Sequence, residues 1–406
     1  MRSLFTIREG GAANWALRLA ATAAVLFVVW WVPVNGGSGL ISTTSEALTL
    51  MASAMALNLV LGYTGQISIG HSAFLGIGAY TTGIMVSRYG HNPWLSFPTA
   101  FALAFVLGVI VSFPASRIKG VYLALVTLAL GLVFPQLLTW KKLAWLTGGG
   151  SGLPAKDAVV GTTGFDIGLA ARGKMQTFEI FGWDPWGGDL RKPEAKAAFF
   201  YWIGIAIVVV VYLACRGVVK SRAGRSLIAI RDNETAAAVM GVNLVATKAF
   251  VFGLSAGLCA LPGCLIAIKT GGVSPEIASL TVRGAITMLI VMVIGGAGSL
   301  WGPMIGALVY VFATDKMGEW ADDSKIPGVL RPFFGWAKIG PADGIFALLL
   351  ILLMFVAPRG LAGLWKQYSP MLVRIVPRPA GSVGATMGAA PAVSDTTTTT
   401  NEGEPQ

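Results

Sequence analysis

The stretch AFFYWIGIAIVVVVYLACR, residues 198–216, decides the fold class, because its 19 residues contain one charge and that charge lies at the end. An α-helix of about 20 apolar residues crosses the roughly 30 Å hydrocarbon core of a bilayer at about 1.5 Å per residue. Similar runs recur along the 406-residue chain, which is 55% hydrophobic and 12% charged, whereas soluble proteins carry roughly 25% charged residues. The sequence therefore predicts an all-α, polytopic transmembrane helical bundle.

About ten spans are expected. They are 15–34, 40–62, 67–87, 97–116, 119–140, 198–216, 246–268, 284–297, 300–314 and 343–357. The first run follows Arg2 and Arg8, as a secretory signal would, but Asn35–Gly39 offers no small-x-small cleavage site, so a retained helix is expected. The eighth and ninth runs are separated by the short, glycine-rich segment Gly295–Pro303 and are either re-entrant, broken or fully spanning.

These runs divide the chain into five expected regions. They are an N-terminal transmembrane helix (1–40), an N-terminal bundle with a glycine-rich motif (41–140), an extracytoplasmic loop (141–197), a C-terminal bundle (198–366) that contains an inner loop (216–248), and a disordered cytoplasmic tail (379–406). The extracytoplasmic loop is rich in turns and aromatics, and the tail is rich in Ala, Gly, Pro and Thr with little to bury.

Charge placement gives the orientation. The formal net charge of +11 could suggest nucleic acid, but the basic residues lie in loops between apolar runs. Such loops face the cytoplasm when their Lys and Arg lie close to the helix ends. The densest basic loop contains Arg216, Lys220, Arg222, Arg225, Arg231 and Lys248. We expect this loop, and both termini, on the cytoplasmic side of the membrane, with lipid and not nucleic acid as the partner of these charges.

Several chemistries are not expected. The chain contains no G-x-x-x-x-G-K-[ST] phosphate loop, so it does not hydrolyse ATP itself. Its two histidines are too few for a metal site, and its three cysteines fall in or beside apolar runs, so neither a metal nor a catalytic group is expected. Only Glu46 is a plausible charge within a span, where a charge costs about 2.5 to 3.5 kcal/mol. Glu46 is either a proton site or a group hydrated near a helix end, so an ion-coupled secondary transporter is the second hypothesis.

The inner loop contains a predicted short helix. Asp232 or Asn233 can cap it, the following alanines favour it, and Gly241 can end it in a left-handed conformation. Its length would be about two turns, roughly 12 Å. Its face of small residues would let another protein approach closely, with flanking charges fixing the orientation. The alternative is an amphipathic loop on the membrane surface.

Two further segments combine glycine with polar residues. Gly298, Gly302 and Gly306 recur every four residues, a spacing that favours close helix packing. In the Gly62–Tyr80 segment, the polar groups either line a solute path or satisfy one another inside the bundle. These candidates for a substrate pathway are Gln66, Ser68, His71 and Ser72.

Together these segments resemble the permease family of ATP-binding-cassette (ABC) importers for branched-chain amino acids, in its LivM-like branch. The resemblance covers roughly residues 45 to 365. It rests on Leu57–His71, Tyr122–Leu128, Thr147–Gly149, Gly224–Gly241, Ser274–Glu276, Gly295–Ser299 and Pro358–Leu361, in this order. Related permeases for urea and short amides share the same motifs.

The resemblance implies a transport subunit that is not an enzyme. Its partners would be a second, related permease, two cytoplasmic ATPase subunits that bind ATP and Mg²⁺, and an extracytoplasmic solute-binding protein, while this chain would bind no cofactor. The solute would be a branched-chain or other hydrophobic amino acid, with urea or a short amide as the alternative. The implied ATPase-coupling residues are Arg222, Gly224, Arg225, Arg231, Asp232, Glu234, Ala236, Ala237 and Gly241. Thr235 stands where importer motifs usually have Glu.

Overall fold

The computed structural model describes residues 5–8, 12–91, 93–116, 121–154, 193–277, 280–322, 360–364, 367 and 373–376. The chain forms two compact units, residues 1–25 with 368–406 and residues 26–367. In the smaller unit, strands β1 (Phe5–Arg8) and β4 (Val373–Val376) pair in parallel, with Phe5 opposite Val373. The regular structure in the described residues of the larger unit is helical, apart from the short antiparallel pair β2 (Leu153–Pro154) and β3 (Gly272–Val273).

The described helices follow the apolar runs of the sequence. They are α1 (Ala12–Asn35), α2 (Ser38–Thr64), α3 (His71–Ser87), α4 (Pro93–Ser116), α5 (Val121–Thr139), α6 (Ala144–Thr147), α7 (Pro193–Lys220), α8 (Arg222–Asp232), α9 (Glu234–Val239), α10 (Leu244–Thr270), α11 (Val282–Gly295) and α12 (Gly302–Asp322), with the 3₁₀ helix Gly149–Ser151 after α6.

Five of these helices are long and apolar enough to cross a membrane. The five spans are Ser38–Thr64, Pro93–Pro114, Tyr122–Thr139, Ala197–Lys220 and Leu244–Thr270. Thr22–Asn35, Val282–Gly295 and Gly302–Asp315 are shorter apolar helices. The expected span 343–357, most of the expected loop 141–197 and the tail 379–406 lie outside the described residues. The structure supports an all-α membrane bundle, and the count of ten spans stays a prediction.

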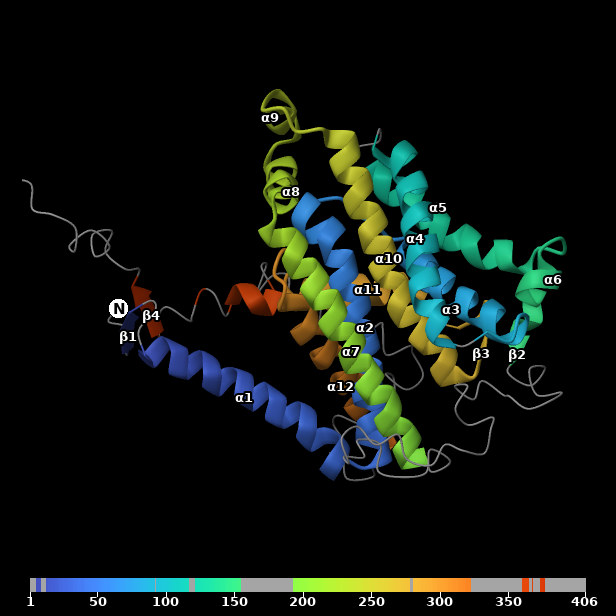
Figure 1. Ribbon diagram of the computed structural model, residues 1–406, viewed down its shortest axis with the longest axis horizontal. Coiled ribbons are helices and arrows are strands. Elements are labelled where there is room, and N and C mark those ends of the chain that lie inside the picture. The colour runs from blue at the N-terminus through green and yellow to red at the C-terminus, as the bar shows by residue number, and fades with distance from the viewer. Residues whose placement is uncertain are drawn as a thin grey trace, which may run out of the picture. The chain divides into compact units, whose positions relative to one another are not determined.

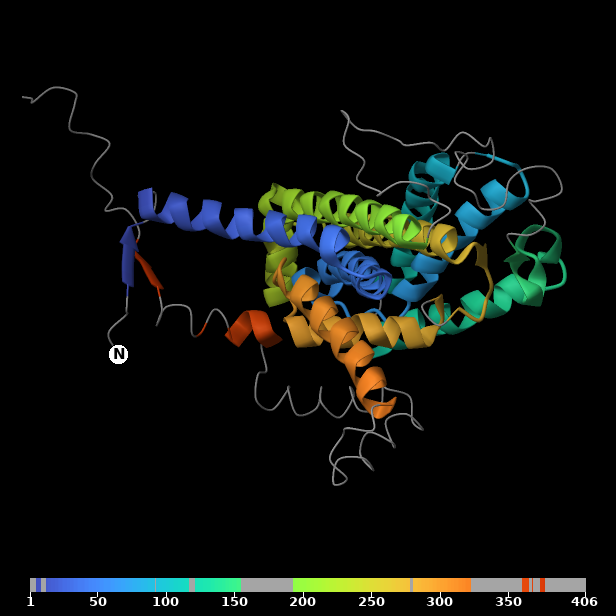
Figure 2. The same cartoon turned by 90° about the horizontal axis from the view of Figure 1, so that it is seen from below.

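Helices α2 and α10 form the centre of the bundle. In each of them 83% of the most apolar stretch is buried, against 28% in α4 and α5. Figure 1 shows α7, α2 and α10 side by side, and Figure 2 shows α7 and α12 on opposite sides of α2. The outward faces of α4 and α5 are apolar, with exposed side chains such as Val106, Ile110 and Leu132. Such faces suit lipid.

The helices are interrupted at two places, at the junctions between expected spans. Residues 65–70 are not helical, so α3 begins at His71 and not at residue 67. The second interruption separates α11 from α12 at 296–301. α11 has 14 residues, which is about 21 Å and shorter than the hydrocarbon core. The two runs around the Gly295–Pro303 segment are thus separate helices, and whether they are re-entrant, broken or fully spanning stays a prediction.

Helices α3 and α10 cross in direct backbone contact. A Cβ atom on Gly78 would meet the carbonyl oxygen of Ala260, and one on Gly263 would meet the carbonyl oxygen of Leu75 and lie 3.1 Å from the nitrogen of Ala79. Glycine at these positions lets two helices pack at a distance that any side chain would prevent. The crossing holds α3, and therefore His71 at its start, against the central helix.

We predict that Gly263→Ala lowers the thermal unfolding temperature of the purified protein, because the added methyl group forces α3 and α10 apart. Overpacking of this kind costs about 1 to 3 kcal/mol. Gly217→Ala on α7 is the matched control, since nothing lies within 4 Å of its added Cβ, and alanine favours a helix by up to about 1 kcal/mol. Equal or higher stability of Gly263→Ala relative to Gly217→Ala would contradict the close crossing.

Candidate functional site

Helix α8 lies at the end of the bundle where α2 and α7 finish (Figure 1). It is amphipathic and buries Gly224, Leu227 and Ile230, while Arg222 and Arg225 are exposed. The Ser221 hydroxyl caps its first turn by accepting a hydrogen bond from the Gly224 nitrogen at 3.4 Å. The buried face packs α8 onto the bundle and leaves the basic residues at the surface.

Helix α9 is the short helix expected in the inner loop, and Asn233 is its cap. The Asn233 side-chain oxygen accepts a hydrogen bond from the Ala236 nitrogen at 3.0 Å. The helix covers Glu234–Val239, about 9 Å and not the expected 12 Å, because the backbone already leaves the helical conformation at Met240. Gly241 follows with φ 85°, as its left-handed role requires.

The surface of α9 is mostly solvent-exposed. Ala237 is buried, whereas Thr235, Ala236 and Ala238 are exposed. Val239 and Met240, at the end of the helix, are 82% and 84% exposed. The helix thus presents two highly exposed apolar side chains beside a row of small residues.

A partly buried ion pair fixes α9 to α10. Lys248 on α10 is buried and donates to the Glu234 carboxylate at the start of α9. The side chains are 6% and 27% exposed. Removing one partner of such a shielded ion pair strongly destabilises the folded protein, because the other charge is left buried and unpaired. The pair therefore holds the start of α9 against α10.

Arg231 fixes α8 to the end of α2. Its guanidinium donates to the carbonyl oxygen of Gly62 at 3.0 Å, and it also lies 3.5 Å from the Asp232 carboxylate. The last carbonyls of a helix have no partner within it and carry the negative end of the helix dipole, which favours a cation. Through its contact with Gly62, Arg231 supplies both the missing hydrogen bond and the positive charge at this end of α2.

The same place holds the turn between α11 and α12. Asn58 on α2 is buried, donates to the carbonyl oxygen of Ser299 at 2.8 Å and accepts from the Gly298 nitrogen at 3.0 Å. Gly298 has φ 76°, and a Cβ atom there would lie 3.1 Å from both Arg231 and the Gly62 carbonyl oxygen. Glycine is required because the turn is left-handed and Arg231 leaves no room for a side chain.

The expected packing face Gly298–Gly302–Gly306 is divided between two roles. Gly298 belongs to the turn, whereas Gly302 and Gly306 belong to α12. A Cβ atom on Gly302 would meet the backbone of residues 295 and 296, and one on Gly306 would meet the carbonyl oxygen of Val291. These two glycines bring α12 against α11.

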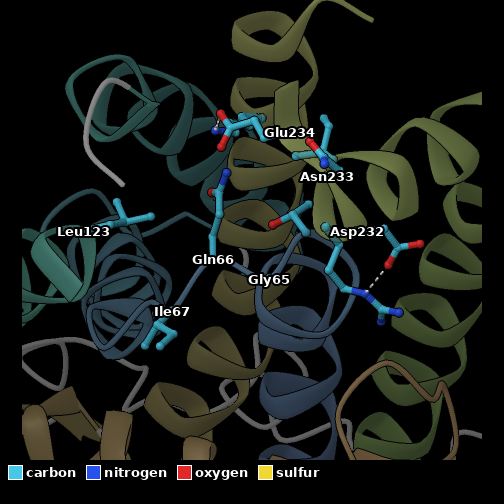
Figure 3. Close-up of a pocket in the computed structure, with 11 residues that line it drawn as sticks. Gly65, Gln66, Ile67, Leu123, Asp232, Asn233 and Glu234 are labelled. Atoms are coloured by element: carbon cyan, nitrogen blue, oxygen red, sulfur yellow. Dashed lines mark hydrogen bonds and ion pairs between the residues drawn. The ribbon is translucent and has the colours of Figure 1, made fainter. Parts of the chain in front are cut away.

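A cavity of about 270 Å³ lies where the inner loop meets the 65–67 segment. In Figure 3 the Gln66 side chain extends toward Glu234, and dashed lines mark the two ion pairs. The lining residues are Thr64, Gly65, Gln66, Ile67, Leu123, Ile230, Arg231, Asp232, Asn233, Glu234 and Lys248. The structure thus brings one predicted pathway residue, Gln66, together with the predicted coupling residues Arg231, Asp232 and Glu234.

The other three predicted pathway residues are buried away from this cavity. His71 is fully buried and forms hydrogen bonds with Ser68 through Nδ1 at 2.8 Å and with Ser255 through Nε2 at 2.9 Å. Ser255 in turn donates to the Ala56 carbonyl oxygen at 2.5 Å. The Ser72 hydroxyl is buried without a hydrogen-bond partner in the described part of the chain. The Ser68–His71–Ser255 arrangement joins the interrupted segment to α2 and α10.

Four residues of this region were not identified from the sequence as site residues. Asn58 and Thr127 lie inside motifs that carried the family resemblance, and Lys248 was counted only as a basic loop residue. Thr127 accepts a hydrogen bond from the Ile69 nitrogen at 3.0 Å and so holds the interrupted segment against α5. Ser255 gave no signal, because a serine in an apolar run has many possible partners.

A bundle of long apolar helices with a charged, capped and partly exposed helical loop at one end defines a multispanning membrane permease component. The sequence model of the family described as "Branched-chain amino acid transport system / permease component" matches residues 39–357. The chain therefore belongs to this family, and it is a permease component of an ABC importer. The family is a transport component and not an enzyme family.

Named relatives agree with this assignment. The high-affinity branched-chain amino acid permease protein LivM of Escherichia coli (strain K12) is 28% identical over 74% of this chain and 68% of its own length. The probable permeases LivM and LivH of Methanocaldococcus jannaschii are 23% and 22% identical, each over 78% of this chain and over 84% and 90% of their own lengths. No solved structure matches the chain.

We predict that Glu234→Lys and Lys248→Glu each lower the thermal unfolding temperature, because breaking a buried ion pair costs about 3 to 5 kcal/mol. The double variant Glu234→Lys/Lys248→Glu recovers most of the loss, since it restores the pair with reversed signs. Asp232→Asn is the control at the more exposed pair, where the expected change is about 0 to 1 kcal/mol. Additive losses in the double variant would show that the two residues do not act as a pair.

Proposed function

We propose that this chain is the permease subunit through which a branched-chain or other hydrophobic amino acid enters a bacterial cell, with α9 as the helix that receives movement from an ATPase. The family and the LivM relatives support the solute class. The observation that carries the coupling role is the double attachment of the inner loop, through Glu234–Lys248 to α10 and through Arg231–Gly62 to α2.

The proposed assembly contains a second, related permease, two cytoplasmic ATPase subunits and an extracytoplasmic binding protein. Matches to both LivM and LivH proteins support a pair of permeases. ATP and Mg²⁺ would bind to the ATPase subunits. The 216–248 loop and both termini would lie in the cytoplasm, the 141–197 loop would face the binding protein, and about ten spans would cross the membrane.

The attachments give a mechanism for coupling. Closure of the ATPase pair on ATP would push the exposed surface of α9. Because α9 is fixed to α10 and the adjoining α8 is fixed to α2, the push would reach the two central helices of the bundle without passing through a flexible loop. Rigid-body rocking of these helices would then alternate the access of the solute between the two sides of the membrane.

Two alternative functions can be distinguished from the proposed one by simple measurements. A urea or short-amide permease would assemble in the same way, so only the solute bound by the cognate binding protein distinguishes it. An ion-coupled secondary transporter would accumulate solute in vesicles that contain this chain alone, and a protonophore would abolish that uptake. Autonomous uptake of this kind would exclude the proposed function.

We predict that Met240→Glu weakens association with the ATPase subunits by about tenfold or more, because it places a charge in the apolar part of the contact. Trp145→Glu is the control, since Trp145 is also exposed, at 67%, but lies on α6 outside the inner loop. Co-purification of the ATPase with each variant, together with solute-stimulated ATP hydrolysis, measures the effect. If Met240→Glu retains both at the level of Trp145→Glu, α9 is not the contact.

A further inference from the structure

Helix α2 has a polar stripe at the end opposite to the inner loop. Ser42, Glu46, Thr49 and Ser53 follow one another at spacings of four, three and four residues, so they share one face of the helix. Ser42 and Glu46 are exposed, Thr49 is half-buried and Ser53 is buried. The stripe therefore leads from the surface into the bundle.

This face differs from the other exposed faces of the bundle. The exposed positions of α4, α5 and α7 hold large apolar side chains, such as Ile110, Leu132 and Leu213. A carboxylate that faces lipid is costly, so charged residues within membrane spans face water or another protein. The α2 face that contains Glu46 is consequently not a lipid face.

A positive charge lies next to this stripe. Lys269, in the last turn of α10, donates to the Ser42 carbonyl oxygen at 3.4 Å. Ser42 is one helical turn before Glu46, so Lys269 contacts one turn of α2 and Glu46 lies on the next. In the described part of the chain, the ion pairs within 4 Å are Arg231–Asp232 and Lys248–Glu234, so Glu46 and Lys269 are not in direct contact.

The inner end of the stripe reaches the buried polar network. Thr49 and Ser53 donate to carbonyl oxygens one turn back, at 3.0 and 2.8 Å, which leaves each hydroxyl oxygen able to accept a hydrogen bond. Ala56, one turn beyond Ser53, accepts the Ser255 hydroxyl. Polar groups thus continue along α2 from Glu46 to the neighbourhood of His71.

We propose that the α2 stripe and Lys269 form the outer solute site of the permease, at which Glu46 receives the ammonium group and Lys269 the carboxylate of a zwitterionic amino acid. This inference rests on the proposed transport function and names the part of the chain that meets the solute. Both charged ends of a zwitterion lose water when it leaves the binding protein, and a site with both signs replaces that water. A neutral solute such as urea requires no such pair.

Thiol accessibility tests whether this face is aqueous. Glu46→Cys and Ser42→Cys, in the complete complex in lipid nanodiscs, should react with an anionic methanethiosulfonate at least about tenfold faster than Val106→Cys, because the thiolate forms in water and not in lipid. Val106 is the matched control, with 53% exposure on the apolar face of α4. The native cysteines Cys215, Cys259 and Cys264 are buried and give a low background. Reaction of Glu46→Cys as slow as that of Val106→Cys would overturn the proposal.

Charge removal tests the recognition itself. Glu46→Gln and Lys269→Gln should each lower the uptake of labelled leucine by the complete complex in proteoliposomes by about tenfold or more. Glu276→Gln, which removes an exposed acid outside the stripe, should leave uptake unchanged. ATPase association should persist in all three variants, so that lost uptake with a normal level of association identifies a defect in solute recognition. Loss of association in Glu46→Gln or Lys269→Gln would contradict a role confined to the solute. Normal uptake by Glu46→Gln and Lys269→Gln would refute the zwitterion site.

Discussion

The structure depends on the hydrogen bonds that the backbone N–H and C=O groups form where α2 ends. The last carbonyl groups of a helix have no partner within it, so where a helix ends against the bundle other groups must supply the missing hydrogen bonds. At this end Arg231 bonds the Gly62 carbonyl oxygen, the Gly65 nitrogen bonds the Leu61 carbonyl oxygen at 3.2 Å, and Thr127 receives the Ile69 nitrogen. These three contacts come from α8, α2 itself and α5, and they determine which elements must meet there.

Because one of those contacts comes from α8, the inner loop cannot be an independent appendage. Arg231 lies against α2 and the Gly298 turn, and Glu234 lies against Lys248 of α10. A partly buried ion pair is weak evidence for stability, since the desolvation of its charges opposes their attraction. Its value here is mechanical, because it determines the position of α9 relative to α10. The exposed Val239 and Met240 lie at the end of α9, the helix proposed to receive displacement from the ATPase.

The features that the sequence predicted are those determined by neighbouring residues. The apolar runs gave the helices, and Asn233, the alanines and Gly241 gave α9 with its cap and its end. The features that it did not predict join residues far apart in the chain. Asn58 meets Gly298 and Ser299, His71 meets Ser255, and Arg231 meets Gly62. Hydrophobic periodicity predicts which face of a helix is buried, but it does not predict which side chains of another helix that face contacts. The Gly298–Gly302–Gly306 spacing was misleading in the same way. It is regular in the sequence, but Gly298 lies in the turn before α12, which begins at Gly302.

The hydrogen bonds of His71 indicate a structural role for this residue and not a solute-binding role. Both ring nitrogens are occupied by serine hydroxyls, and the ring packs edge-on against Phe74 and Phe252, with centroid separations of 5.6 and 5.4 Å. A side chain whose polar atoms and faces are all occupied holds helices together better than it binds a passing solute. Of the described polar residues predicted from the sequence, Gln66 lines the cavity beside the inner loop and Glu46 is exposed on the polar stripe of α2. In the proposed mechanism, a displacement imposed at Gly62 by Arg231 would reach Glu46 along α2, because α2 is a continuous helix of 27 residues. The helix proposed to receive the movement would then also be the helix that presents charge to the solute.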